Sequence, residues 1–256
     1  MAASSLDYLL HLADNALVLG QRNAEWCGKG PVLEEDIALA NMSLDLIGQA
    51  RLLYQHAATV QGEGASEDTL AYFRDAQDFR NYTLLELPHA SNTSERDYAV
   101  TITRNFLYSA LMLLLWDALQ DSKDTQLAAI AGKSLKEVRY HFRHSRDWLL
   151  RLGDGTKESQ ARTQWALKHL MPYTQEYWTQ TAIETVAISE GIATDTRAFR
   201  THWDTLVDEA LKEAGLQRPG SDAALPLGKN GDHSEHLTPL LADMQGLARA
   251  HPEALW

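Results

Sequence analysis

Ile37-Ala-Leu-Ala-Asn-Met-Ser-Leu-Asp-Leu-Ile-Gly48 is apolar on nearly every side when it is drawn as a helix. A helix that is hydrophobic all round is buried among other elements. Three acids, Glu34, Glu35 and Asp36, stand just before this segment, and acids are favoured in a first helical turn because of the helix dipole. The sequence therefore predicts a central helix from about Leu33 to Val60.

Helices are predicted on both sides of this segment, and strand signals are nearly absent. Three more long helices are expected over about 4–22, 94–119 and 125–152, and four shorter ones over 157–171, 174–192, 195–214 and 234–249. Four long helices with short connections indicate an antiparallel bundle. We expect an all-α, ferritin-like four-helix bundle with additional C-terminal helices. It would form a single domain over 1–256, with a core bundle at about 4–152 and a helical extension at about 156–256.

The charge and cysteine content narrow the range of functions. The formal charge is −12, from 23 basic and 35 acidic residues, so we expect no nucleic-acid partner, because such binding depends on cations that neutralise phosphates. Cys27 is the only cysteine, which excludes an internal disulfide and an all-thiolate zinc or iron–sulfur site. No apolar run approaches the roughly 20 residues of a membrane span. The cytoplasm is the expected location.

A ferritin-type bundle can hold two irons with a well-defined ligand pattern. The pattern takes a Glu from each of two helices and a Glu-x-x-His pair from each of the other two, because residues three apart share a helix face. Of the ten histidines, only His89 has a Glu three residues before it, at Glu86. Pro88 lies between them and predicts a loop. The sequence therefore has no helical Glu-x-x-His pair.

The positions where iron ligands would stand carry other residues. In the central helix, Asp45 is followed three residues later by Gly48, where a His would be needed. The helix at 94–119 has no Asp, Glu, His or Cys in its middle, and Ser109 is the polar residue nearest that point. We expect no catalytic, cofactor-binding or metal-binding residue in this chain. The degenerate ligand region would comprise Asp45, Gly48, Ser109, Glu137 and His141.

Charge pairing is expected where a metal would otherwise sit. Asp45 lies in a polar row with Asn41 and Gln49, and a buried carboxylate is costly unless it is paired. An Arg or Lys of the helix at 125–152, such as Lys136, can neutralise Asp45 or Glu137. We therefore expect a salt-bridged or hydrogen-bonded core network.

Two histidine clusters leave alternatives open. Glu137, His141 and His144 are four and three residues apart and share one helix face, so they could bind a single transition metal. An enzyme with this unconventional metal site is therefore an alternative. His233-Ser-Glu-His236 could form a second metal cluster, but we favour a helix start that Ser234 caps.

A histidine and two acids near the N-terminus are expected at the surface. His11 lies one helical turn from both Asp7 and Asp14. We expect these three side chains on a solvated or ion-pairing face.

Several segments, taken together, resemble a known family. Their order and spacing run nearly from one end of the chain to the other. They are Asp14-Asn-Ala-Leu-Val-Leu-Gly-Gln-Arg22, Glu25-Trp-Cys27, Leu39-Ala-Asn41, Leu44-Asp-Leu-Ile-Gly-Gln-Ala-Arg51, Gln126-Leu-Ala-Ala-Ile130, Lys136-Glu-Val-Arg-Tyr-His141, Ser189-Glu-Gly-Ile192, His233-Ser-Glu-His-Leu237 and Met244-Gln245. The chain resembles the structural subunits, of the PaaC type (older name PaaI), of the phenylacetyl-CoA epoxygenase, also called the ring 1,2-epoxidase.

The resemblance implies a non-catalytic part in a multicomponent oxygenase of aerobic phenylacetate degradation. A catalytic subunit of the same fold would hold the di-iron centre, and this chain would pair with it and stabilise it. A small subunit and a flavin and iron–sulfur reductase are further partners that the resemblance implies, and a homodimer is an option when the partner is absent. The family pattern has an acid near the position of Ser109, so this chain departs from it there.

Aromatic side chains and an acyl-CoA-binding role are the last features considered from the sequence. Trp26, Tyr108, Trp116 and Trp256 are candidates for the partner interface, because aromatic residues are enriched at interfaces. An ordinary place in the core is the equal alternative for each of them. The third reading is a helical module that binds an acyl-CoA or a small hydrophobe without catalysis.

Overall fold

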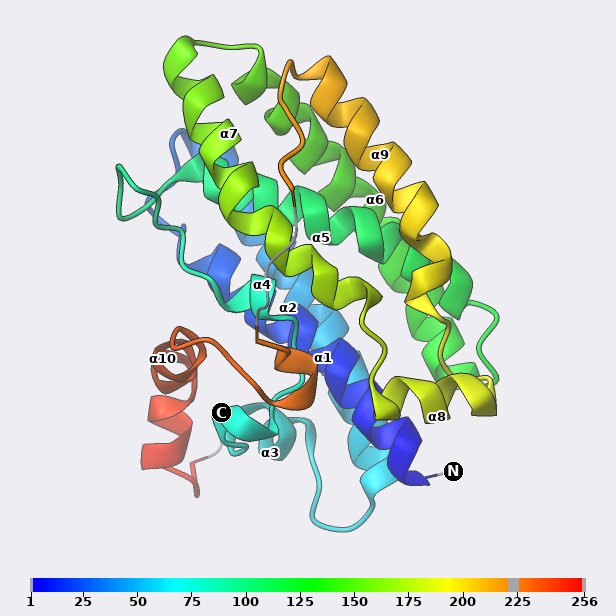
Figure 1. Ribbon diagram of the computed structural model, residues 1–256. Helices are drawn as coiled ribbons and strands as arrows, with labels where there is room; N and C mark the ends of the chain where they lie inside the picture. The colour runs from blue at the N-terminus through cyan, green and yellow to red at the C-terminus, as the bar shows by residue number, and fades with distance from the viewer. Residues whose placement is uncertain (1, 221–225, 255–256) are drawn as a thin grey trace. The chain divides into compact units, whose positions relative to one another are not determined.

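The fold was examined in a computed structural model that describes residues 2–220 and 226–254 (Figure 1). Helices form every regular element in these two ranges. Their contacts divide the chain into two compact units, one made of Met1–Leu87 with Pro226–Trp256, and the other of Pro88–Leu225. Each unit is described by itself below.

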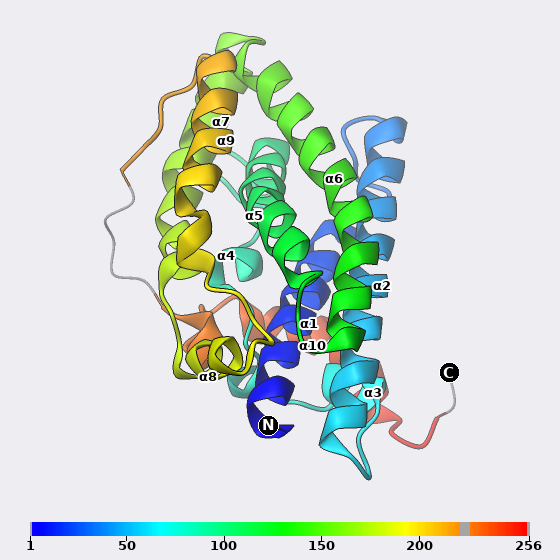
Figure 2. The same ribbon diagram turned by 90° about the vertical axis from the view of Figure 1, so that its right-hand side faces the viewer.

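The first unit is built on an antiparallel pair of long helices, α1 (Ala2–Ala24) and α2 (Leu33–Gln61), which lie side by side in Figures 1 and 2. Their close approach depends on Gly20. A Cβ at this position would lie 3.3 Å from the Leu46 side chain and 3.4 Å from the Ser43 carbonyl oxygen. A larger residue would therefore push the two helices apart.

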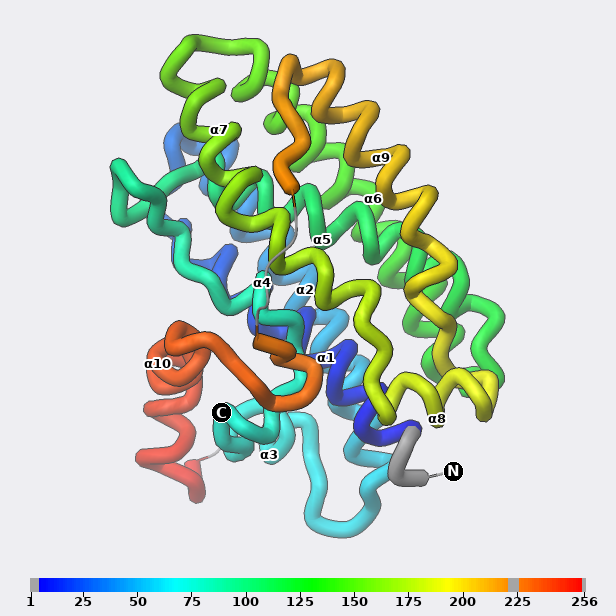
Figure 3. Tube along the Cα trace, viewed as in Figure 1, coloured from blue at the N-terminus to red at the C-terminus, as the bar shows by residue number. Residues whose placement is uncertain are grey.

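Short helices and the C-terminal segment complete this unit. They are α3 (Glu67–Tyr72), η1 (Ala76–Asp78), α4 (Thr83–Glu86), η4 (Gly228–Asn230) and α10 (Leu237–Ala250). Figure 3 shows α10 beside α3 although most of the chain separates them in sequence. Gln245 fixes this contact, because its side-chain amide donates to the carbonyls of Ala71, at 3.0 Å, and Arg74, at 3.1 Å.

The second unit is built around α5 (Tyr98–Leu119). The helices α6 (Thr125–Gly153), α7 (Lys157–Leu170) and α9 (Arg200–Glu213) pack against α5, and Figure 2 shows α5 among them. Trp203 donates its indole N–H to the Leu107 carbonyl at 3.1 Å. Three shorter elements complete the unit: η2 (Met171–Trp178), α8 (Ala182–Glu190) and η3 (Thr196–Phe199).

Helix α5 is long and apolar enough to cross a membrane, with a mean hydropathy of 1.3 over its best window. However, 89% of that window is buried inside the molecule. The core helix of a water-exposed protein gives the same signal, so α5 is weak evidence for a membrane span.

The prediction of an all-α, ferritin-like fold is confirmed in its elements. Each unit contributes one pair of long antiparallel helices, α1 with α2 and α5 with α6, and further helices follow toward the C-terminus. Most predicted boundaries lie within a few residues of the observed ones. The single domain over 1–256, with a core at 4–152 and an extension at 156–256, stays a prediction.

Two expectations about individual helices are wrong. The segment 174–192 is not one helix, because Thr181 and Glu184 form a capping box that begins α8 at Ala182. The segment 37–48 is not buried on every side either. Its buried side packs on α1, while Ile37, at 53%, and Leu44, at 66%, stay exposed on the other.

Candidate functional site

In the first unit, two of the expected ligand positions lie near the surface of α2. Asp45 is half-buried, and the polar row that contains it runs from the exposed Asn41 to the buried Gln49. Gly48 has open space around it, because no atom lies within 4 Å of a Cβ built there. Asp45 is therefore not the fully buried acid that the sequence pattern suggested.

In the second unit, α5 presents a neutral hydroxyl where an acid would be needed. Ser109 is buried, donates to the Phe106 carbonyl at 3.3 Å, and lies 3.4 Å from the hydroxyl oxygen of Ser145 on α6. The Ser145 hydroxyl donates in turn to the His141 carbonyl at 2.7 Å. Two hydroxyl groups, those of Ser109 and Ser145, thus lie close together between α5 and α6.

The acid and histidines of α6 have separate surroundings. Glu137 forms an ion pair of 3.2 Å with Lys133, one turn away on the same helix. The ring of His141 is buried, and that of His144, half-buried, lies 5.9 Å from the ring of Tyr140. Lys133, rather than the expected Lys136 or an arginine of the same helix, pairs with Glu137.

These residues do not fit a metal centre. In ranges 2–220 and 226–254, no three side chains of His, Cys, Asp or Glu come together in a way that could hold a metal ion. Glu137, His141 and His144, the alternative single-metal set, are included in that statement. A di-iron centre needs several carboxylates and imidazoles, and α5 offers Ser109 instead. That this chain holds no metal stays a prediction for direct metal analysis.

The first fully buried acid of the first unit is Asp14, on α1. The Tyr54 hydroxyl on α2 donates to one of its carboxylate oxygens at 2.5 Å, and the backbone N–H of Arg80 donates to the other at 2.8 Å. The Arg74 guanidinium forms a two-point contact with both oxygens. The expectation of a solvated face for Asp14 is therefore wrong, and the ion-pairing alternative holds.

This arrangement changes the proton affinities of the groups around Asp14. Burial first, and then the Asp14 charge, hold the pKa of Tyr54 well above its usual value of 10.0. For Arg74, burial is the largest single effect and lowers the pKa, but the charges of Asp14 and Tyr54 and their hydrogen bonds together outweigh it, so the pKa rises. Tyr54 stays a neutral donor and Arg74 a cation at any physiological pH. Asp14, Tyr54 and Arg74 form what we call the Asp14 network.

The second fully buried acid of this unit is Glu86, at the end of α4. Its carboxylate accepts hydrogen bonds from the Asn81 side-chain amide at 3.0 Å, and from the Ser234 backbone N–H at 2.8 Å and hydroxyl at 2.7 Å. His233 also contacts it through Nδ1. The Arg22 Nε donates to the Glu86 carbonyl at 3.0 Å. Glu86, Asn81, His233 and Ser234 form what we call the Glu86 network.

This network corrects the expected cap of the last helix. Ser234 is not the N-cap of α10, which begins at Leu237 with His236 as N-cap. The Ser234 hydroxyl is instead committed to Glu86. The His233 ring likewise contacts Glu86 through one nitrogen, and its Nε2 lies 3.0 Å from the Phe79 carbonyl oxygen. The segment His233-Ser-Glu-His236 therefore fastens the C-terminal region to α4.

Of the two alternatives for the aromatic candidates, partner interface and core, the core holds for three. Trp26, Tyr108 and Trp116 are buried core residues. Trp256 lies outside the residues that the structure describes. The exposed apolar side chains are mostly aliphatic and gather near the start of α2, where Val32, Leu33, Ile37 and Leu44 are all more than half exposed.

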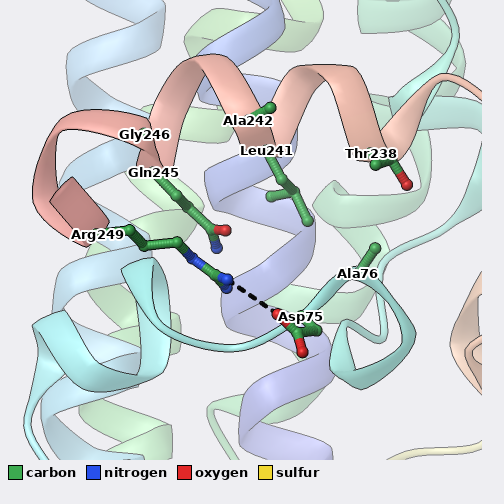
Figure 4. A pocket seen from close by; sticks show the side chains of 8 residues that line it. All are labelled: Asp75, Ala76, Thr238, Leu241, Ala242, Gln245, Gly246 and Arg249. Atoms are coloured by element: carbon green, nitrogen blue, oxygen red, sulfur yellow. Dashed lines mark hydrogen bonds and ion pairs between the residues drawn. The ribbon is translucent and has the colours of Figure 1, made fainter.

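Three surface pockets are each lined by an arginine that already forms an ion pair. A pocket of about 320 Å³ lies between α10 and η1, and Figure 4 shows Arg249 at its edge, 2.9 Å from Asp75. In a second pocket, of about 470 Å³, Arg51 binds Glu67 at 2.9 Å. A third, of about 380 Å³, contains Arg162, which binds Asp97 at 3.1 Å. A coenzyme A phosphate would have to compete with a carboxylate in each of these pockets.

The two buried networks were not predicted, although part of the signal was present. Asp14 lies on the same face as the apolar Leu10 and Leu17, three or four residues away, and an acid inside an apolar stripe implies a buried partner. Nothing in the sequence identified Arg74 as that partner. The Glu86 network depends on residues 147 and 148 positions away, which helical spacing does not relate.

Comparisons with known proteins identify the family of this chain. The family model described as phenylacetic acid catabolic protein matches residues 2–256. The chain is 45% identical over 249 residues to the C subunit of the 1,2-phenylacetyl-CoA epoxidase of Escherichia coli (strain K12), covering 97% of this chain and 98% of that protein. With a match over nearly its whole length and this degree of identity, the chain belongs to the phenylacetic acid catabolic protein family.

Proposed function

We propose that this chain is the non-catalytic structural subunit of a multicomponent phenylacetyl-CoA 1,2-epoxidase. It would pair with the di-iron catalytic subunit and stabilise it during aerobic phenylacetate degradation, in the cytoplasm. The E. coli relative carries the name of a subunit of this epoxidase, so partner subunits are expected here too. A small subunit and a reductase are the further partners, and a homodimer is an option when the catalytic subunit is absent.

The observation that carries the proposal is that the middle of α5 offers no carboxylate, imidazole or thiolate, and its buried charged side chain, Arg104, is a cation. This helix is the most deeply buried long helix of the second unit, and Ser109 is the polar group near its middle. The Ser109 hydroxyl bonds to a carbonyl of its own helix. A hard cation such as iron prefers anionic or imidazole ligands, and a neutral hydroxyl replaces them poorly. Oxygen activation is therefore assigned to the partner.

The surface of α2 supports a stable partner. Leu33, at 71% exposed, Ile37 and Leu44 lie on the side of α2 that does not pack on α1. Exposed apolar side chains that gather on one face commonly mark protein–protein contacts. The buried networks of Asp14 and Glu86 would keep this face rigid, because their hydrogen bonds connect α1, α2, α4 and the C-terminal segment.

The other two readings have less support. A single-metal enzyme would need Glu137, His141 and His144 to converge, and they form no metal-binding group. An acyl-CoA module would need a cation free to bind phosphate, and the arginine of each described pocket is ion-paired. Metal analysis and calorimetry distinguish both readings from the structural-subunit role.

Co-expression with the di-iron subunit tests the proposal directly. The two chains should co-purify at a fixed ratio, and the double variant Ile37→Glu with Leu44→Glu should abolish the complex. Val186→Glu is the matched control, because Val186 is also exposed, at 45%, but lies on α8. Circular dichroism would verify that all variants fold. Failure of the unmodified chains to co-purify would refute the structural-subunit role.

Metal analysis and calorimetry address the alternatives. The purified chain alone should contain far less than one iron per molecule, while its complex should contain the two irons of the partner. Stoichiometric iron in the isolated chain, lost in His141→Ala, would favour the single-metal enzyme. Tight binding of phenylacetyl-CoA to the isolated chain would favour the acyl-CoA module.

A further inference from the structure

The imidazole of His233 lies between two hydrogen-bond acceptors. Its Nδ1 contacts the Glu86 carboxylate, and its Nε2 lies 3.0 Å from the Phe79 carbonyl oxygen. Both side chains of this pair are buried, with 7% of His233 and none of Glu86 exposed. A neutral imidazole carries a proton on only one of its nitrogens. It can therefore donate to one of these two acceptors but not to both.

The Phe79 carbonyl determines where one proton lies. A carbonyl oxygen accepts and never donates, so the Nε2 of His233 must carry a proton to bond with it. A neutral ring would then turn the lone pair of Nδ1 toward the Glu86 carboxylate, and two acceptors would face each other in a buried site. A second proton, between Nδ1 and the carboxylate, removes this conflict. The geometry thus requires one proton more than a neutral imidazole and an ionised carboxylate hold together.

The other partners of Glu86 favour placing this second proton on the ring. The Asn81 amide donates at 3.0 Å to Oε1, the same oxygen that contacts His233. The backbone N–H and the hydroxyl of Ser234 donate to Oε2 at 2.8 and 2.7 Å. Hydrogen bonds donated to a carboxylate stabilise its ionised form. We therefore describe the Glu86–His233 pair as a buried carboxylate with an imidazolium.

Two arginines lie beside this pair. Arg22, on α1, donates from Nε to the Glu86 carbonyl at 3.0 Å and binds Glu25 at 2.6 Å. Arg80 donates to the Phe79 carbonyl at 2.8 Å, so it places a cation near the His233 ring and opposes its protonation. Arginine does not lose its proton below about pH 12. Neither cation can therefore be the source of a response to pH near neutrality.

Other charged or titratable groups lie on the elements around the pair. They are the Asp14 network, His11, Lys229, Asp232, Glu235 and His236. Histidine is the side chain that ordinarily titrates near neutral pH. A test of the pair must therefore distinguish His233 from His11 and His236.

We propose that the Glu86–His233 pair is a proton-dependent latch, which holds the C-terminal segment 226–254 on the segment 79–86 and loosens as the pH rises. Opening would return the ring of His233 to water, where an imidazole loses its proton near pH 6.5. The closed state keeps that proton. The contribution of the latch is therefore fully present below about pH 6.5. Above it, each pH unit favours the open state by up to about tenfold, until the closed state also loses the proton.

Helix α10 is the part of this segment whose release can be measured. Leu237, Leu240 and Leu241 are buried, and the Gln245 amide donates to carbonyls of the first unit beside α3. Opening would expose these leucines and break the Gln245 hydrogen bonds. The backbone amides of α10 would then exchange with solvent.

Hydrogen exchange of the α10 amides in the full chain tests the proposal. Rates are measured between about pH 6 and 9 and divided by the intrinsic rate at each pH, so that the protection factor reports the opening equilibrium. Protection of α10 in the unmodified chain should fall by up to about tenfold for each pH unit above about pH 6.5. Protection that does not change with pH would overturn the inference.

Three variants assign the response to the pair. Glu86→Gln and His233→Gln remove the pair from its two sides, and each should make the protection of α10 independent of pH. Glu86→Gln leaves every histidine in place, so it excludes His11 and His236 as the source. His236→Gln is the matched control, because His236 lies in the same segment with 38% of its side chain exposed, and it should keep the pH dependence. The same pH dependence in Glu86→Gln as in the unmodified chain would overturn the inference.

NMR of the histidine ring nitrogens gives a second readout that needs no variant to fold. At pH 7.5 about nine-tenths of a free imidazole is neutral. His233 in the unmodified chain should instead show a proton on Nε2 and a second proton at Nδ1, in contact with Glu86. A His233 ring with a single proton at this pH would overturn the inference.

Discussion

Ser234 donates two hydrogen bonds to the buried carboxylate of Glu86, one from its backbone at 2.8 Å and one from its hydroxyl at 2.7 Å, across 148 residues of sequence. This contact fastens the segment before α10 to the end of α4. Because the carboxylate is fully buried, every donor it loses leaves a charged oxygen without a substitute from water. The Glu86 network should therefore control how firmly the C-terminal segment is held.

Ser234→Ala tests this relationship. The substitution removes the hydroxyl donor and leaves the backbone donor, so the free energy of unfolding should fall by about 1–3 kcal/mol. Glu86→Gln should cost at least as much, because its amide group would face the donors of Ser234 and His233. Urea denaturation followed by circular dichroism measures both changes.

The control for this prediction is Ser189→Ala. Ser189 is exposed, and its hydroxyl donates to the Val186 carbonyl within α8. Its substitution should change the free energy of unfolding by less than about 0.5 kcal/mol. Equal effects of Ser234→Ala and Ser189→Ala would mean that the Ser234 hydroxyl contributes nothing to stability.

In the Asp14 network, removing the cation should lower the stability more than removing the Ser234 hydroxyl does. Arg74→Met keeps much of the side-chain length but leaves Asp14 as a buried anion without its cation. Breaking a buried pair in this way costs about 3–5 kcal/mol, and the Tyr54 and Arg80 donors would recover only part of that loss. The unfolding midpoint in urea should shift accordingly.

The matched variants separate pairing from the loss of an arginine. Adding Asp14→Asn to Arg74→Met should restore part of the stability, because the unpaired charge is gone. Arg197→Met removes an exposed guanidinium that pairs with Asp195 and should leave the midpoint unchanged. A midpoint for Arg74→Met equal to that of Arg197→Met would contradict the assignment of a stabilising role to the pair.

The sequence predicts where the helices of this fold lie better than it predicts what each helix packs against. Apolar periodicity locates α1, α2, α5 and α6 within a few residues, because each helix must bury a face of its own. It does not distinguish a face that meets the core from one that meets another protein. The segment 37–48 is the example, since its exposed Ile37 and Leu44 look the same in sequence as its buried Leu39 and Leu46.

The buried charges show a second limit of the sequence. Asp45 and Glu137 stand at the expected ligand positions, but within residues 2–220 and 226–254 the fully buried acids are Asp14 and Glu86. The partner of Asp14 is 60 residues away, and that of Glu86 is farther still. Helical spacing relates only residues within a few turns. Which two residues form a buried ion pair can therefore be learned only from the folded chain.

Stability at high pH should depend on the phenol of Tyr54. Its pKa lies well above 10.0 in the folded chain, first because of burial and then because of the Asp14 charge. In the unfolded chain this phenol loses its proton near pH 10. Above that pH the folded state holds a proton that the unfolded state has released, so folding becomes less favourable as pH rises. The contribution is fully present below pH 10.

Tyr54→Phe should therefore lower stability at pH 8 and reduce its alkaline loss. At pH 8 the variant loses the hydrogen bond to Asp14, which costs about 1–2 kcal/mol. Between pH 10 and 11 its free energy of unfolding should fall less steeply than that of the unmodified chain, by up to about 1.4 kcal/mol per pH unit. Urea denaturation at several pH values measures both effects. Tyr140→Phe, on an exposed ring, is the control, and its free energy of unfolding should fall with pH as steeply as that of the unmodified chain. The same steepness in all three proteins would show that the fold does not protect Tyr54 from ionisation.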